Sequence, residues 1–168
     1  MKTYAAALGA SVKWITVGAY VVLLSVAFLA FYLRFAVKAP LLAFWVTAGT
    51  TTVISIASLG FRIHGYDLGP DELVIRYGFW RRVIRLGDVL SVSSGNGVIN
   101  RSLRICASGG LWSFLGLFHH GELGRFRADV SDLSKVVMLV TAAGRVLVSP
   151  SEPEQFVRDI TAHSPNLA

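Results

Sequence analysis

The chain has 168 residues, enough for one domain with a short appendage, and 54% of them are hydrophobic. With a mean hydropathy of +0.58, this composition excludes an ordinary soluble domain. All ten acidic residues lie after residue 60, whereas four basic residues precede it: Lys2, Lys13, Arg34 and Lys38. The first part thus carries +4 and the remainder, with twelve basic residues, only +2, which is typical of a protein beside anionic lipid and gives no indication of nucleic-acid binding.

Residues 1–13 are basic and rich in alanine, and we expect a helical lead-in at the membrane surface. The apolar run that follows has full spanning length, and no small-x-small cleavage site comes after it. We therefore expect a retained anchor and not a cleaved signal peptide.

Two runs without a charged side chain follow, residues 14–33 and 39–61, separated by residues 34–38. A helix rises about 1.5 Å per residue, so roughly 20 residues cross a hydrocarbon core about 30 Å thick. A buried helical pair in a soluble protein is the alternative, but charge-free runs longer than roughly 18 residues are unusual there. The sequence predicts a transmembrane hairpin with spans at about residues 14–33 and 40–60.

The orientation of this hairpin depends on its flanking charges. Lys2 and Lys13 precede it and Arg34 and Lys38 lie in its tip, so these pairs balance. The balance is broken by arginines after the second span: Arg62, Arg76, Arg81, Arg82 and Arg85. The positive-inside rule then predicts a multi-pass inner-membrane protein with both termini in the cytoplasm.

Hydroxyl side chains line the second span: Thr47, Thr50, Thr51, Thr52, Ser55 and Ser58. They are expected to bond their own backbone or the other helix of the hairpin, or else to support a homo-oligomer or a larger membrane partner. Neither span contains an ionisable residue, which argues against a proton or ion path.

Beyond the spans the pattern changes to short alternating runs, which predict strands at residues 62–68, 73–77, 81–86, 89–93, 136–141 and 145–149. Ser151 and Glu154 have the spacing of a capping box, and the helix predicted after them, residues 152–163, places Phe156, Val157 and Ile160 on one face. The fold class is a transmembrane helical hairpin plus a mainly-β barrel or sandwich with a C-terminal capping helix. The expected division is an anchor at 1–60, a domain at 61–163 and a tail at 164–168.

Four segments in order carry a family resemblance: residues 83–89, 110–118, 123–127, and 146–150 shortly before 153–156. With them, residues 61–163 resemble a bacterial pleckstrin-homology-like domain of the kind tethered to a two-helix membrane anchor. The resemblance implies a partly open barrel capped by a C-terminal helix, without known catalytic residues. Eukaryotic relatives that bind phosphoinositides use a basic loop between their first two strands, whereas the corresponding residues 68–72 are acidic here.

No motif predicts an enzyme, a metal centre or a cofactor. The histidines and Cys106 lack C-x-x-C or H-x-x-x-H spacing, and no G-x-S-x-G elbow is present. The favoured function is a non-catalytic module for protein or peptide interaction at the cytoplasmic membrane face. The alternatives are an anionic-lipid-binding domain and an uncharacterised enzyme acting on lipid or envelope intermediates.

Two segments are candidate sites. Arg81, Arg82 and Arg85 form the densest basic cluster, which predicts either a lipid-headgroup contact or a solvated strand face, with Arg82 on the opposite face of the strand from the other two. The second segment is residues 111–118, whose glycines argue against a regular central strand. It is expected to be either an interfacial loop or a buried loop over the open end of the barrel. Its large apolar residues are Leu111, Trp112, Phe114, Leu115, Leu117 and Phe118.

Overall fold

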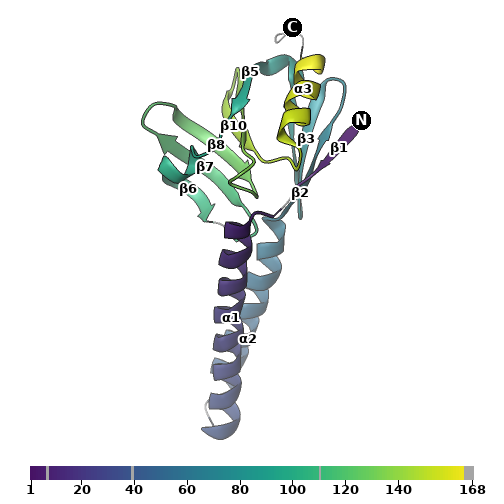
Figure 1. The fold of residues 1–168 in the computed structure, drawn as a ribbon. Helices are drawn as coiled ribbons and strands as arrows, with labels where there is room; N and C mark the ends of the chain where they lie inside the picture. The colour runs from purple at the N-terminus through teal and green to yellow at the C-terminus, as the bar shows by residue number, and fades with distance from the viewer. Residues whose placement is uncertain (7, 39, 110, 165–168) are drawn as a thin grey trace.

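Two antiparallel helices form a stalk beneath a β domain (Figure 1). The computed structural model describes residues 1–6, 8–38, 40–109 and 111–164. The stalk consists of α1 (Ala10–Ala36) and α2 (Leu41–Gly60). Both helices are long and apolar enough to cross a membrane, and only 6% of the most apolar window of each is buried, unlike the core helix of a soluble protein. The two helices thus suggest a membrane association.

The hydroxyl side chains of α2 mostly bond their own helix. Each of five donates to the carbonyl four residues earlier: Thr47, Thr50, Thr51, Thr52 and Ser55. Hydrogen bonds between the helices come from Tyr20, whose hydroxyl lies 2.8 Å from Ser58 Oγ and 3.3 Å from the Ser55 carbonyl oxygen. The structure therefore shows two of the expected roles. Most of the α2 hydroxyls bond the backbone of their own helix, and one links the two helices.

The first strand, β1 (Lys2–Ala5), corrects the expected helical lead-in. It pairs antiparallel with β2 (Ile63–Leu68), so that Tyr4 lies opposite Tyr66. Tyr4 is buried against Phe156, and its hydroxyl bonds Asp159. These tertiary contacts outweigh the helix preference of the alanines in this segment.

The smaller sheet holds four strands in the order β1-β2-β3-β4, adding β3 (Glu72–Tyr77) and β4 (Arg81–Arg85). All of its pairings are antiparallel. Because β1 precedes the stalk and β2 follows it, the helical hairpin is inserted between two neighbouring strands of one sheet. The domain-side ends of the two helices therefore lie side by side beneath the β domain (Figure 1).

The larger sheet has six strands in the order β5-β9-β10-β8-β7-β6. Its strands are β5 (Val89–Ser94), β6 (Leu103–Gly109), β7 (Phe114–His120), β8 (Gly124–Val130), β9 (Val137–Thr141) and β10 (Gly144–Val148). The β8–β10 pair is parallel and the other pairs are antiparallel. Two 3-10 turns, Leu86–Asp88 and Ile99–Arg101, precede and follow β5.

Each face of the larger sheet contributes to a different apolar core. Along β10, Val146 and Val148 join the core between the sheets, whereas Leu147 belongs to a second cluster on the opposite face. This alternation follows from the two-residue repeat of a strand. The second cluster also contains Val12 of α1, so the stalk and the larger sheet share buried surface.

The C-terminal helix α3 (Pro153–His163) covers the core between the sheets, with Phe156 and Ile160 fully buried and Val157 packed beside them. This face is the one that the sequence predicts. The capping box is wrong, because the N-cap residue is Glu152 and it makes no side-chain capping bond.

Six strands were predicted, and all six are confirmed with ends shifted by a residue or so. Of the predicted barrel or sandwich, the sandwich is correct, because among the described residues the strands form two packed sheets and not a closed barrel. Ser164 is buried and its hydroxyl bonds the Leu86 carbonyl, whereas residues 165–168 of the predicted tail lie outside the described residues. The division of the chain at residue 60 stays a prediction.

Candidate functional site

The domain meets the stalk at a neck formed by the first turn of α1 and the last turn of α2. On one side, the Gly9 N–H donates to the Ser131 carbonyl at 2.8 Å, directly before α1 begins. On the other, the Gly78 N–H donates to the Gly60 carbonyl at 3.2 Å, at the end of α2. Each sheet is thus bonded to the stalk by backbone close to a helix end.

The contact between Gly78 and α2 requires glycine. A Cβ on Gly78 would lie 2.2 Å from the Leu59 carbonyl oxygen, and one on Gly60 would lie 2.6 Å from the Phe79 ring. Absence of both side chains lets the β3–β4 turn approach the helix backbone. The turn is therefore held at the level of the end of the helix.

Large aromatic side chains of this turn face solvent. Phe79 is 64% exposed and Trp80 is 43% exposed. Trp80 stacks on Tyr77 and contacts Phe61 edge-on, which fixes the turn against the first residue after α2. Exposed aromatic rings beside the end of an apolar helix are typical of the membrane interface.

A second tryptophan at the neck is tied into the protein. The Trp112 backbone N–H donates to Thr16 Oγ1 at 3.0 Å, and its indole N–H donates to Ser58 Oγ at 3.3 Å. Its ring contacts Tyr20 edge-on, and the Arg62 guanidinium lies over it. Trp112 therefore links the larger sheet to both helices of the stalk.

The predicted interfacial loop is mostly a strand. Phe114–His120 forms β7, between β6 and β8, and Phe114, Leu115 and Phe118 are buried, whereas Leu117 is exposed and Leu111 half-buried. The glycines do not prevent a central strand, but β7 is irregular at Gly116, where φ is +128° and the pairing with β6 shifts register between Arg104 and Cys106. A Cβ on Gly116 would lie 2.3 Å from the Cys106 carbonyl oxygen, so the close approach of β6 requires glycine there. Contact of these side chains with lipid stays a prediction.

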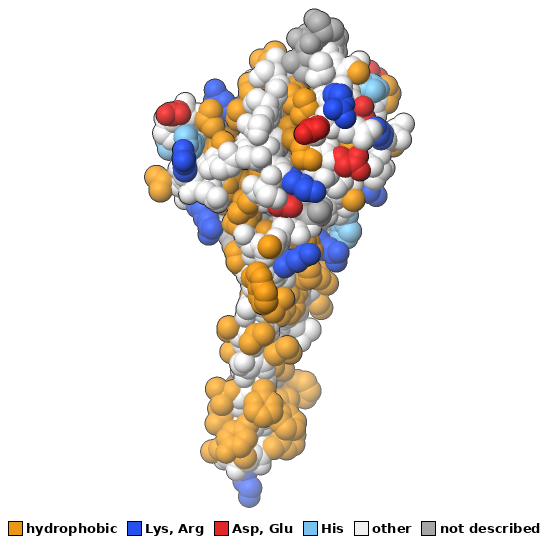
Figure 2. All heavy atoms as spheres, in the orientation of Figure 1, with side chains coloured by type: hydrophobic (Ala, Val, Ile, Leu, Met, Phe, Trp, Pro, Cys, Tyr) orange, Lys and Arg blue, Asp and Glu red, His pale blue; other side chains and the backbone are white. Residues whose placement is uncertain are grey.

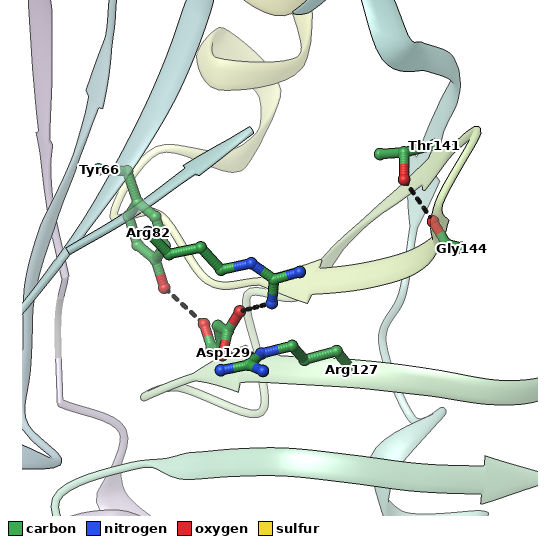
Figure 3. A network of polar contacts seen from close by, with 6 residues as sticks. All are labelled: Tyr66, Arg82, Arg127, Asp129, Thr141 and Gly144. Carbon is green, nitrogen blue, oxygen red and sulfur yellow. Dashed lines mark hydrogen bonds and ion pairs between the residues drawn. The ribbon is translucent and has the colours of Figure 1, made fainter. Parts of the chain in front are cut away.

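A polar cluster joins the two sheets, with Arg82 on β4 and with Arg127 and Asp129 on β8 (Figure 3). Asp129 of β8 is fully buried, and it accepts from Nη1 of Arg82 at 3.2 Å and from Nε of Arg127 at 3.3 Å. The arginine side chains themselves are 33% and 40% exposed. Two guanidinium groups thus share one carboxylate, leaving the cluster with a net positive charge that reaches solvent.

Two tyrosines of the smaller sheet border this cluster. Tyr66 is fully buried, donates to the Asp129 backbone carbonyl and accepts from the Ser149 N–H, which joins the two sheets. Burial raises the pKa of Tyr66 well above its ordinary value. Burial and then the Asp129 carboxylate raise the pKa of Tyr77 as well, so both tyrosines stay neutral at physiological pH.

The predicted arginine cluster divides between two faces of β4. Arg81 and Arg85 are exposed on the outer face, whereas Arg82 points inward to Asp129, as the alternation predicted. The structure pairs Arg82 with Arg127, a residue that the sequence analysis did not single out. Residues 124–130 form a strand that was not predicted from the sequence, and alternation along it was the only sequence pattern that could have indicated Arg127.

A groove lies between α3 and the ends of β5 and β9, with a volume of about 860 Å³. Val136, Val137 and Val157 supply apolar lining. The charged lining residues are Lys135, Arg158, Glu152 and Glu154. In the strand order, β5 is terminal and pairs with β9 alone. An edge strand of this kind offers unpaired backbone groups to another chain.

The histidines do not gather. Across the part of the chain that the structure describes, no three His, Cys, Asp or Glu side chains are placed to hold a metal ion. The lone Cys106 is exposed on β6.

Comparison with known proteins identifies the domain. Residues 64–164 match the family model described as bacterial PH domain, which covers more than half of the chain. No curated protein and no solved structure matches it. The match begins within β2, so β1 and the stalk are outside the matched residues. The chain belongs to the bacterial PH domain family, and the resemblance seen in its sequence is confirmed.

Proposed function

We propose that this protein is a membrane-anchored, non-catalytic module that presents a peptide-binding groove at the cytoplasmic face of the inner membrane. Membership of the PH family supports an interaction role, because this fold hosts many binding functions. The exposed apolar stalk supports membrane anchoring. Figure 2 shows hydrophobic side chains along the stalk and charged ones over the domain.

The topology supports placing both termini on one side. Pairing of β1 with β2 keeps the residues before α1 and after α2 in one folded unit. The many arginines of that unit favour the cytoplasm, with Arg34 and Lys38 at the far tip. A cytoplasm-only reporter fused after Ala168 should be active and one inserted at Val37 should be inactive; the reverse pattern would contradict this orientation.

The observation that carries the proposed function is the groove between α3 and the ends of β5 and β9, next to the terminal strand of the larger sheet. An extended peptide can add to such an edge through its backbone while alternate side chains enter a neighbouring groove. Here α3 forms one wall, and the lining offers both an apolar floor and charges of either sign. This arrangement suits an extended segment of a partner protein better than a small substrate.

Site-specific photo-crosslinking in cells tests this groove. A photoreactive residue at Glu154, in the groove, should give a discrete crosslinked protein, and the same residue at Glu122, in the β7–β8 turn, should not. Adding Arg158→Glu should reduce the yield from position 154, because it reverses a charge of the lining. Equal products from both positions would contradict a role for the groove.

A further inference from the structure

We propose that the neck binds the phosphate of an anionic membrane lipid, with Arg82 and Arg127 as the phosphate-binding pair and the β3–β4 turn as the part that enters the interface. This site is distinct from the α3 groove and does not depend on the proposed peptide binding. It also differs from the arginine cluster expected from the sequence, because Arg85 is outside it.

The first argument is the charge of the cluster. Asp129 engages one nitrogen of each arginine, Nη1 of Arg82 and Nε of Arg127. The Tyr77 hydroxyl also contacts the Arg127 guanidinium. Both side chains nevertheless reach solvent, at 33% exposure for Arg82 and 40% for Arg127. The buried carboxylate orients both groups, and the remaining N–H donors of each planar fork are left for a second anion, for which phosphate has matching geometry.

The second argument is position. Tyr77, which borders the cluster, is followed directly by Gly78, whose N–H bonds the end of α2. Asp129 lies two residues before Ser131, whose carbonyl bonds the residue that precedes α1. Tyr77 and Asp129 are therefore one and two residues from backbone that bonds the helix ends, and the guanidinium groups of Arg82 and Arg127 reach this level through their bonds to Asp129. In a stalk that spans the bilayer, this is the level of the headgroups.

The third argument is the composition of the surrounding surface. Phe79 and Trp80 are exposed at the same level, and Arg81 follows them. Lys13 and Arg62, also exposed, follow the start of α1 and the end of α2. Figure 2 shows Lys and Arg side chains where the stalk meets the domain. Aromatic rings with basic residues at one depth match an anionic lipid surface.

Acidic residues at the neck do not cancel this charge. Asp129 is already shared by two arginines. Asp132, which packs against Gly9, bonds the backbone and hydroxyl of Ser134, and among the described residues it forms no ion pair with either arginine. Tethering to the stalk keeps the cluster beside headgroups at all times, which favours lipid phosphate over a dissolved anion.

The test is lipid retention by the full-length protein, purified in mild detergent and measured by native mass spectrometry with added phosphatidylglycerol or phosphatidylcholine. The wild type should retain phosphatidylglycerol preferentially. Each basic residue near a charged leaflet contributes roughly a fivefold change in affinity, so Arg82→Gln with Arg127→Gln should lower retention by roughly 25-fold. Arg85→Gln, on the outer face of the same strand, is the matched control and should retain the lipid.

Because loss of both arginines leaves Asp129 without partners, Arg82→Lys provides a second variant that keeps the charge but lacks the planar fork. It should fold and show an intermediate loss. Equal retention of both lipids by the wild type, or an equal loss in Arg85→Gln, would overturn the proposal. Displacement of phosphatidylglycerol by millimolar inorganic phosphate would also overturn it, in favour of a site for soluble anions.

Depth measurement tests the turn independently. In a Cys106→Ser background, a spin label at Phe79→Cys in vesicles should be accessible to oxygen and shielded from a water-soluble relaxant, whereas one at Glu122→Cys should show the opposite. A fully water-accessible label at position 79 would exclude insertion of the turn.

Discussion

Two tryptophan-bearing segments lie at the neck, and they differ in what holds them. Trp112 donates both of its N–H groups to side chains of the stalk and is half-buried. Trp80 makes ring contacts with Tyr77 and Phe61, but among the described residues no hydrogen bond engages its indole N–H. The first segment joins the larger sheet to the stalk, whereas the second leaves a polar N–H and an apolar ring for the surroundings.

The comparison shows that local hydrophobicity is a poor guide to which segment keeps its aromatic side chains exposed. Residues 111–118 are the more apolar of the two, yet their large side chains mostly fill the core. Glycine at 60 and 78 brings the shorter β3–β4 turn against the end of α2, and Phe79 and Trp80 of this turn stay exposed. Hydrogen-bond partners and close approach, more than composition, separate the two segments.

The largest expected difference between them is in stability. Phe118 is fully buried and stacks on Phe126, so Phe118→Ala should destabilise the domain by about 3–5 kcal/mol. Phe79→Ala removes an exposed ring and should change stability by less than about 0.5 kcal/mol. Thermal unfolding of the full-length protein in detergent measures both, and similar losses would contradict the assignment of the first segment to the core.

The next effect concerns the contact between the β3–β4 turn and the end of α2. Gly78→Ala places a Cβ 2.2 Å from the Leu59 carbonyl oxygen, so the turn must move away from α2, at a cost of about 1–3 kcal/mol. A Cβ on Gly87 meets nothing within 4 Å, which makes Gly87→Ala the matched control. The same thermal unfolding assay separates the two. An unchanged melting temperature in Gly78→Ala would mean that the turn is not held against the helix.

Much of this architecture was predictable from the sequence, and the failures have identifiable causes. Charge-free runs longer than 18 residues and alternating strands such as β3 and β9 have strong local patterns. By contrast, β1 and β7 depend on partners that are distant in the sequence. β1 is a strand because it pairs with β2 at the edge of the smaller sheet, and β7 contains Gly116 because the β6 backbone passes close to that residue. Local periodicity contains neither fact.

The candidate site was predictable to a smaller degree. Alternation correctly placed Arg82 opposite Arg81 and Arg85. Its partner Asp129, however, is 47 residues away on the other sheet, and sequence spacing alone gives no indication of a contact between them. The α3 groove likewise appears only once β5 is known to be terminal in its sheet.

A smaller effect tests the hydrogen bonds of the two tryptophans directly. Trp112→Phe removes the bond from the indole to Ser58 and should destabilise the protein by about 1 kcal/mol. Trp80→Phe retains an aromatic ring to stack on Tyr77 and removes an N–H that has no partner among the described residues, so we expect almost no change. Thermal unfolding again measures both, and a larger loss in Trp80→Phe would reverse the comparison.

The smallest expected effect concerns β1, which brings the N-terminus into the same sheet as the exposed turn. Lys2 Nζ lies 2.6 Å from Asp159, and together with the Tyr4 hydroxyl it lowers the pKa of that carboxyl below its ordinary value of 3.8. A carboxyl with a lowered folded pKa stabilises the fold fully above its unfolded pKa, and this contribution is lost as the pH falls through the folded value. Asp159→Asn should therefore melt slightly earlier than the wild type at neutral pH, and the difference should shrink as the pH falls below about 4. Because the pair is exposed, added salt should also reduce the difference. A difference that persists unchanged to low pH would show that the charge of Asp159 does not hold β1 in place.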